Sequence, residues 1–208
     1  MTQGTDSGLG SHFLDTGPFL CLGGSATLAE LYDTAYLTDA RVAEAVAVEV
    51  KRRATARTQP GDPRRRGAAD DAARSAEHRY RALLNSVTPR PDPIPSELAE
   101  IEADLLARAQ QKRPDKNHHP LAHRGESESI HAAESSNTNF ISCDDDARQV
   151  AHSRGVHAET FVDVARRLTR VQHDVKPKRI LGELQTLARN GIDIGDVVQS
   201  VLDLRIAP

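Results

Sequence analysis

Acidic residues gather in one stretch of the chain, residues 123–148, which reads HRGESESIHAAESSNTNFISCDDDAR. Glu126 stands at the start of an expected helix, and Asp144 follows a short apolar strand, 140–142. In open α/β sheets, ligand sites lie in the crevice beyond the carboxyl ends of the strands. Because these carboxylates have no evident partner cation within the segment, they suggest a pocket for a hard divalent metal ion.

A further candidate is Asp15, which ends an expected strand, 12–15, just before the turn Thr16-Gly17-Pro18. Its ordinary role would be to cap a turn or helix by accepting backbone N–H bonds. Its functional role would be that of a carboxylate aimed into the crevice beyond the sheet. The residues alone favour the cap, since Asp-x-Gly turns are common.

Two glutamates lie five residues apart on an expected helix, 44–56. Glu44 and Glu49 therefore point to different faces of that helix, and we do not expect both to reach one metal ion. Glu49 also has an ordinary role, an ion pair with Arg53 one turn later, worth a few tenths of a kcal/mol. The pattern alone favours that surface pair.

The acidic stretch leaves two assignments open. Glu126 and Glu128 both lie at a helix N-terminus, where the helix dipole stabilises a negative side chain. Asp144 and Asp145 can each serve as a metal ligand, and Asp145 can alternatively be the N-cap of the helix that follows.

The patterns around these acids resemble those of the PIN-domain family, whose members include metal-dependent ribonucleases and the VapC-like toxins of bacterial toxin–antitoxin pairs. Family members read φ-L-D-T-[NGS], E-A-V-x-x-E-[VLI], G-E-x-E-A-I, and T-[ND]-D followed by A-R. The matching segments are FLDTG at 13–17, EAVAVEV at 44–50, GESESI at 125–130 and SCDDDAR at 142–148. All four acidic positions occur in the family's order.

The resemblance implies a catalytic site in which four acids hold Mg²⁺ or Mn²⁺: Asp15, Glu49, Glu126 and Asp144. Glu44 is the fallback for Glu49. It further implies that substrate is contacted by Thr16, Ser142 and Arg148. Cys143 stands where many members have Asn or Asp, which leaves Asp145 as the second choice for the last metal ligand.

The chemistry implied is hydrolysis of RNA phosphodiester bonds. Clustered carboxylates repel one another and raise one another's pKa unless a cation neutralises them. A metal-activated water needs no side-chain nucleophile, and the chain has neither a Ser-His-Asp pattern nor a Gly-rich phosphate loop. We therefore expect a Mg²⁺- or Mn²⁺-dependent endoribonuclease. The alternatives are a catalytically silent PIN-like module that binds RNA or a protein, and a flavodoxin-like domain with incidental acids.

Composition limits the architecture and the partners. The chain has 208 residues, 3% aromatic residues and no Trp, so its core must rest on Leu, Val, Ile and Ala. A net charge of −3 exerts no global attraction on nucleic acid. Two cysteines do not make a disulfide framework, and reduced thiols in a cytoplasmic protein are the simpler interpretation. No apolar run approaches about 18 residues, so no membrane span is expected.

We expect a three-layer α/β/α PIN-like domain with a central, mostly parallel sheet of four to five strands and a helical C-terminal extension. Residues 1–10 would be disordered, 11–165 would form the domain with a mobile polar insertion at 57–78, and 166–208 would pack on it as helices. The expected strands are 12–15, 36–42, 83–87, 140–142 and 156–159. The resemblance implies RNA as the substrate, with an antitoxin protein or a second copy of the chain as partner, and no membrane association.

Overall fold

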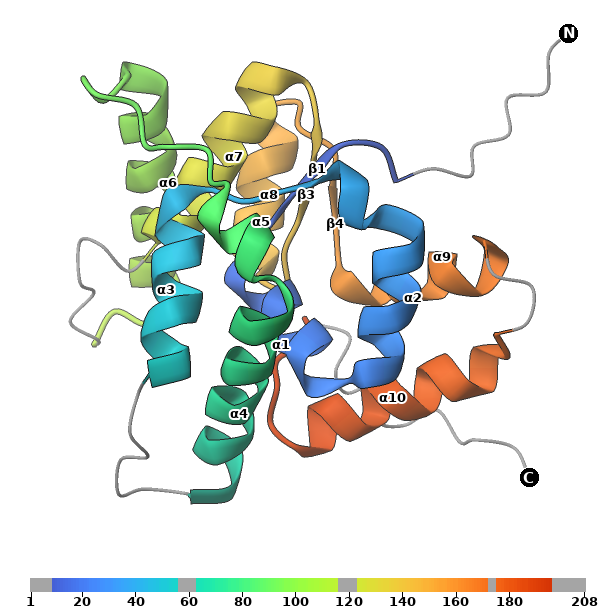
Figure 1. Ribbon diagram of the computed structural model, residues 1–208. Helices are drawn as coiled ribbons and strands as arrows, with labels where there is room; N and C mark the ends of the chain where they lie inside the picture. Colours follow the sequence, from blue (N-terminus) through green and yellow to red (C-terminus); the bar gives the residue numbers. More distant parts are fainter. Residues whose placement is uncertain (1–8, 56–62, 116–122, 172–174, 196–208) are drawn as a thin grey trace, which may run out of the picture.

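The computed structural model describes residues 9–55, 63–115, 123–171 and 175–195. Within these residues, four strands form one parallel sheet in the order β2-β1-β3-β4. The strands are β1 His12–Leu14, β2 Ala40–Arg41, β3 Asn139–Ile141 and β4 Ala158–Glu159. The chain is therefore α/β, as expected, with a small sheet among many helices (Figure 1).

The register of the two central strands brings distant segments together. Leu14 of β1 lies opposite Ile141 of β3, and the amide of Asp15 donates to the Ile141 carbonyl at 3.0 Å. The chain leaves β1 and β3 in opposite directions across the sheet, because β2 lies beside β1 on one side and β4 lies beside β3 on the other. Such a switch point opens a crevice beyond the carboxyl ends of the strands. Asp15 and the residues after Ile141 leave the sheet side by side at this edge.

Helices cover both faces of the sheet (Figure 1). In chain order they are α1 Thr16–Gly24, α2 Ala26–Tyr36, the 3₁₀ helix η1 Leu37–Asp39, α3 Glu44–Thr55, α4 Pro63–Arg79, α5 Arg81–Asn85, α6 Ser96–Lys112, α7 Arg124–Ser136, α8 Asp145–Ser153, α9 Phe161–Val171 and α10 Pro177–Arg189. Successive side chains of a strand point to opposite faces. Phe13 accordingly packs with apolar residues of α6, α7 and α8, whereas Leu14 packs in the larger core on the other face. This arrangement is compatible with a three-layer α/β/α fold.

Helix α4 occupies most of the segment expected to be a mobile polar insertion at 57–78. It packs against α1 and α3, and Ala72, Ala73 and Ala76 are buried. The approach to α1 is so close that a Cβ on Gly23 would lie 1.9 Å from the carbonyl oxygen of Ala72. The contact therefore depends on small residues and not on large apolar ones, which is why the segment reads as solvated. The first part of the expected insertion, 57–62, lies outside the described residues.

Two expected strands are largely helical. Residues 83–85 belong to α5, with Leu84 buried, and only Thr88 makes an isolated parallel bridge, to Ala43 beside β2. Pro89 has no N–H to continue that pairing. In the expected strand 36–42, α2 and η1 extend to residue 39, which leaves only Ala40 and Arg41 as β2. Both segments were expected to be strands because each has too few apolar residues to distinguish helical spacing from the alternating pattern of a strand.

The C-terminal helices of the described chain, α9 and α10, pack against the rest of the molecule. Ile180, Leu184 and Leu187 of α10 join the larger core, and α9 and α10 both contact α2. After α10 the chain turns back, and Gly195 lies against the turn that follows β3. The amphipathic helix expected after Ile194 lies outside the described residues, as do residues 1–8. None of the described helices is long and apolar enough to cross a membrane.

Candidate functional site

Asp15 is both a helix cap and a carboxylate in the crevice. Its Oδ1 accepts from the Thr16 amide at 2.7 Å, and its Oδ2 accepts from the Ser142 hydroxyl at 2.8 Å. The side chain is buried, and burial raises the pKa of Asp15 to about 6 against the opposing effect of these two bonds. The charges of Glu49 and Asp144 raise it further. The two roles weighed from the sequence are therefore compatible.

Glu49 reaches the same place from α3. Its Oε2 accepts from the Thr16 hydroxyl at 2.8 Å, one residue from Asp15. Its Oε1 accepts from Nε and Nη2 of Arg53 at 3.0 and 2.8 Å. The surface ion pair favoured by the pattern is thus present, but the same carboxylate also belongs to the crevice. Glu44 accepts from the amide of Arg90 and is tied to that loop instead.

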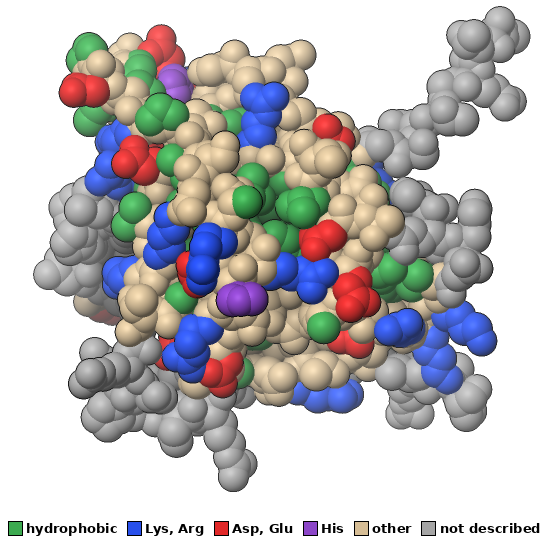
Figure 2. All heavy atoms as spheres, in the orientation of Figure 1, with side chains coloured by type: hydrophobic (Ala, Val, Ile, Leu, Met, Phe, Trp, Pro, Cys, Tyr) green, Lys and Arg blue, Asp and Glu red, His purple; other side chains and the backbone are tan. Residues whose placement is uncertain are grey.

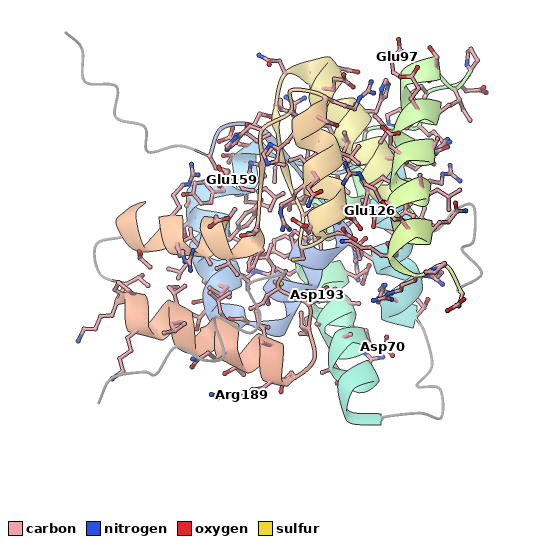
Figure 3. All side chains as sticks on the ribbon, turned by 180° about the vertical axis from the view of Figure 1, so that it is seen from behind. Asp70, Glu97, Glu126, Glu159, Arg189 and Asp193 are labelled. Atoms are coloured by element: carbon pink, nitrogen blue, oxygen red, sulfur yellow. The ribbon has the colours of Figure 1, made fainter. Side chains whose placement is uncertain are left out.

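Glu126 lies in the first turn of α7, and Figure 3, which views the molecule from behind, labels it in the middle of the structure. Restricted access to water is the main cause that raises the pKa of Glu126 well above its ordinary value. The charges of Asp15, Glu49 and Asp144 add to this effect. In the described part of the chain, no cationic side chain pairs with this carboxylate.

Gly125 explains how α7 comes so close to the other acids. A Cβ at this position would lie 3.2 Å from Val46 Cγ2 on α3 and 3.9 Å from Asp15 Oδ1. A Cβ at residue 125 would therefore make a tight contact with α3, and either Val46 or the start of α7 would have to shift by a few tenths of an ångström. The glycine that precedes the acid in the motif therefore has a packing role.

Asp144 joins the group from the start of α8. Its Oδ1 accepts from the amides of Asp146 and Ala147 at 2.7 and 3.2 Å, so it is the N-cap. Its own amide donates to the Ser142 hydroxyl at 3.0 Å. The Asp144 charge adds to the effects that raise the pKa of Asp15 and Glu126, and the Ser142 hydroxyl links Asp15 to the Asp144 amide.

Asp145, the second choice for the last ligand, faces elsewhere. Its carboxylate accepts from Arg148 Nη2 at 3.2 Å and from Gln149 Nε2 at 2.5 Å. Its charge is absent from the causes that raise the pKa of the clustered acids. The structure thus brings together the four acids named first and separates them from Glu44, Glu128 and Asp145.

The three residues expected to contact substrate form hydrogen bonds with the acids or with the turn that carries them. Thr16 binds Glu49, and Ser142 links Asp15 to the Asp144 amide. Arg148 is buried and donates to the Ser142 carbonyl at 3.0 Å and to Asp145. These hydrogen bonds link the ends of the strands, the starts of α1 and α8, and one face of α3 around the crevice.

Cys143, the departure from the family pattern, is a buried residue packed on α1. A Cβ on Gly17 would lie 3.0 Å from its Sγ. A hydrogen bond with the Cys21 thiol, together with burial, raises the pKa of Cys143 well above its ordinary value. Because its side chain enters the core, Asp144 is the residue that turns toward the crevice. Nothing in the sequence pattern indicated the contact between the two cysteines.

The donor set suits a hard divalent cation, since it consists of carboxylate oxygens whose mutual repulsion a cation would relieve. Within the described residues, however, no three Asp, Glu, His or Cys side chains form a ready-made metal-binding group. Two of the four acids are already engaged by other groups of the protein. Arg53 pairs with Glu49, and backbone amides donate to one oxygen of Asp144. Mg²⁺ commonly retains several waters and needs only one or two protein carboxylates.

Comparison of the chain with protein-family models, curated proteins and solved structures found no match. The likeness to the PIN family therefore rests on the four short motifs quoted above and on the meeting of their acids.

Proposed function

We propose that the chain is a Mg²⁺- or Mn²⁺-dependent ribonuclease of the PIN type. One observation supports this most: carboxylates from four separate elements lie at the crevice beyond β1 and β3, where burial and the charges of the neighbouring acids raise the pKa of Asp15 and Glu126. A fold has little reason to gather like charges unless a ligand neutralises them, and perturbed acids in a cleft mark functional sites.

Asp15 and Glu126 are the residues best placed to hold the metal ion, because neither carboxylate is neutralised by a cation in the described chain. Glu49 would join them if its side chain left Arg53, and Asp144 through the oxygen that does not cap α8. When bound, the ion would supply a water of lowered pKa and stabilise charge on the phosphate oxygens.

The chain's own residues supply positioning. The Thr16 amide and the Ser142 hydroxyl prevent rotation of the Asp15 carboxylate. Arg148 holds the turn from which Asp144 projects. Preorganised carboxylates need no rearrangement when the substrate arrives, which lowers the free energy required to reach the transition state.

RNA would be bound by local contacts rather than by a broad basic surface. On the face shown in Figure 2, Lys and Arg side chains alternate with Asp and Glu and form no continuous basic stripe. Cations that adjoin the acidic segments include Arg53 at Glu49 and Lys112 at Asp146. Their side chains are 39% and 58% exposed, so both can contact phosphate groups.

A catalytically silent module that binds RNA or a protein is the second candidate. The observation in its favour is that Glu49 and Asp144 are already engaged by Arg53 and by backbone amides. The toxin role implied by the family resemblance is a further extension of the first proposal, and it requires an antitoxin partner.

The deciding experiment is cleavage of a pool of structured and single-stranded RNAs in Mn²⁺. The Asp15→Asn, Asp144→Asn double variant should cut more slowly by on the order of 100-fold or more, and EDTA should stop the wild type. Glu44→Gln is the matched control, because this acid of α3 lies outside the cluster and its loss should leave cleavage unchanged.

Each other outcome has a definite meaning. Equal cutting by the wild type and the double variant would refute the proposed site. Mn²⁺ binding without cleavage of any RNA would favour the silent module over the ribonuclease.

A further inference from the structure

The only two cysteines of the chain lie together beside the acids. Cys21 belongs to α1, and Cys143 belongs to the turn between β3 and α8. Both are free thiols and both are buried, with exposed fractions of 0% and 5%. Interaction with Cys21 is a cause that raises the pKa of Cys143. One short segment covers both residues, because the Cys21 thiol donates to the Asp193 carbonyl and Gly195 lies against the Cys143 carbonyl.

Independent geometry shows how closely Cys143 approaches α1. A Cβ built on Gly17 would lie 2.9 Å from Cys143 Cβ and 3.0 Å from its Sγ. Gly17 and Cys21 are four residues apart on α1, so they lie on the same face of that helix. Cys143 therefore rests on the α1 face that carries Cys21, in space left by a missing side chain. A disulfide requires Cβ atoms about 3.5–4.5 Å apart, and Cys143 packs one helical turn from Cys21 on the same face of α1.

The turn that carries Cys143 also carries the acid site. Ser142 donates to Asp15 at 2.8 Å and accepts from the Asp144 amide at 3.0 Å. Sulfur atoms in a disulfide are about 2.05 Å apart, closer than any non-bonded contact. Formation of the bond must therefore pull Cys143 toward α1 and move its two neighbours. The expected consequence is a displaced Asp144.

We propose that Cys21 and Cys143 form a reversible intramolecular disulfide that lowers the affinity of the acid site for its metal ion. The disulfide itself is independent of the function proposed above, whereas its effect on metal binding rests on that function. The modification would make the site sensitive to the redox state of its surroundings.

The reaction needs a two-electron oxidant, and a small disulfide such as oxidised glutathione serves. Cys143, as thiolate, attacks one sulfur of the oxidant, forms a mixed disulfide and releases one glutathione thiol. Cys21, as thiolate, then attacks the Cys143 sulfur, and the second glutathione leaves as a thiol. In total two cysteine thiols are oxidised to one disulfide, and one glutathione disulfide is reduced to two thiols.

Access to the pair is controlled by residues 192–195. The Cys21 thiol donates to the carbonyl of Asp193 at 3.5 Å, and a Cβ on Gly195 would lie 3.2 Å from the carbonyl oxygen of Cys143. This segment must move aside before a reagent reaches the sulfurs. Since buried thiols react slowly, the modification should be slow and should be followed to equilibrium.

The test uses the full chain, first reduced and then equilibrated in glutathione buffers of increasing oxidised fraction. After trypsin digestion, mass spectrometry should detect peptide 1–41 joined to peptide 125–148, with the loss of two hydrogen atoms and reversal by dithiothreitol. Cys21→Ala and Cys143→Ser are the two controls that cannot form the bond. Mn²⁺ binding, measured by thermal shift, should weaken by about 10-fold in the oxidised wild type and stay unchanged in either variant treated in the same way.

The outcomes separate the two claims. Absence of the linked peptides at the most oxidising ratio, or glutathione attached without a cross-link, would refute the disulfide. A cross-link with unchanged Mn²⁺ binding would refute the effect on the acid site. Failure of the reduced protein to bind Mn²⁺ would refute the proposed metal site, and with it the coupling, while the peptide map would still decide the disulfide.

Discussion

Two glutamates on α7, two residues apart, have opposite surroundings. Glu128 is almost fully buried, and its Oε1 accepts from Arg90 Nη1 and Arg124 Nε, each at 2.8 Å. Its Oε2 accepts from the amide of Ala45 at 2.9 Å. Glu126, in contrast, faces three other acids and has no cationic partner among the described side chains. One helix thus carries a neutralised acid and an uncompensated one.

The difference separates a structural carboxylate from a candidate functional one. Glu128 ties α7 to the start of α3 and to the loop that holds Arg90, so its charge is used within the fold. Glu126 gains no comparable contact, and the charges of Asp15, Glu49 and Asp144 oppose its own. The metal ion proposed above would supply the missing positive charge. The predictions below test this contrast.

Glu128→Gln should have the largest effect on stability. Glutamine keeps the shape but removes the charge opposite Arg90, whose side chain is only 15% exposed, and opposite Arg124. Loss of one partner of a buried ion pair leaves the other uncompensated, so the free energy of unfolding should fall by about 2–3 kcal/mol. Urea denaturation monitored by circular dichroism measures this change.

The matched control is the same substitution two residues earlier, Glu126→Gln. It removes one charge from the cluster and should leave the free energy of unfolding unchanged or higher in EDTA. A loss as large as that of Glu128→Gln would show that Glu126 is also a structural acid, and the contrast would fail.

Asp15→Asn should stabilise the metal-free protein in a pH-dependent way. The pKa of Asp15 is raised from 3.8 to about 6, so the folded protein binds this proton more tightly than the unfolded chain does. The stability that this contributes is complete below about pH 3.8 and is lost as the pH rises through about 6. Asparagine stays neutral, so the variant should gain about 1–2 kcal/mol near pH 8 and almost nothing near pH 4. Thermal melts in EDTA across this range measure the difference.

Asp145→Asn provides the comparison for that experiment, because Asp145 is paired with Arg148 and Gln149. It should lose a little stability at pH 8 instead of gaining any. If Asp15→Asn were destabilised equally at both pH values, the bonds that Asp15 accepts as a helix cap would outweigh its repulsion.

Arg53→Gln should have the smallest effect. The Arg53 and Glu49 side chains are 39% and 30% exposed, and exposed pairs contribute less than about 1 kcal/mol. Because Arg53 competes with a metal ion for Glu49, its removal should strengthen Mn²⁺ binding by about 2- to 5-fold. Titration calorimetry, with Arg52→Gln on the same helix as control, tests this expectation. Weaker binding in the variant would mean that Arg53 orients Glu49 toward the metal.

Short-range patterns predicted several elements well. The helices near 44–56 and 96–111, the strands near 12–15 and 140–142, and the parallel order of a small sheet agree with the structure. Each depends on a local signal, such as helical spacing or a short apolar run followed by an acid. Helix α4 was missed because its burial relies on alanines that fit beside Gly23, and that fit exists only when α1 is in place.

The sequence by itself supplied the four motifs that resemble the PIN family, although the local patterns alone favoured a cap for Asp15 and a surface ion pair for Glu49. It left open the choice between Glu44 and Glu49 and between Asp144 and Asp145. Only the tertiary structure shows which acid of each pair lies near Asp15, since a side chain's direction depends on how its helix is rotated against its neighbours. Packing between helices sets Glu49, Glu126 and Asp144 near Asp15. It also pairs Glu128 with Arg90 and sets Cys143 against the helix that carries Cys21. No local pattern encodes such contacts, because they join residues through the core and not along the chain.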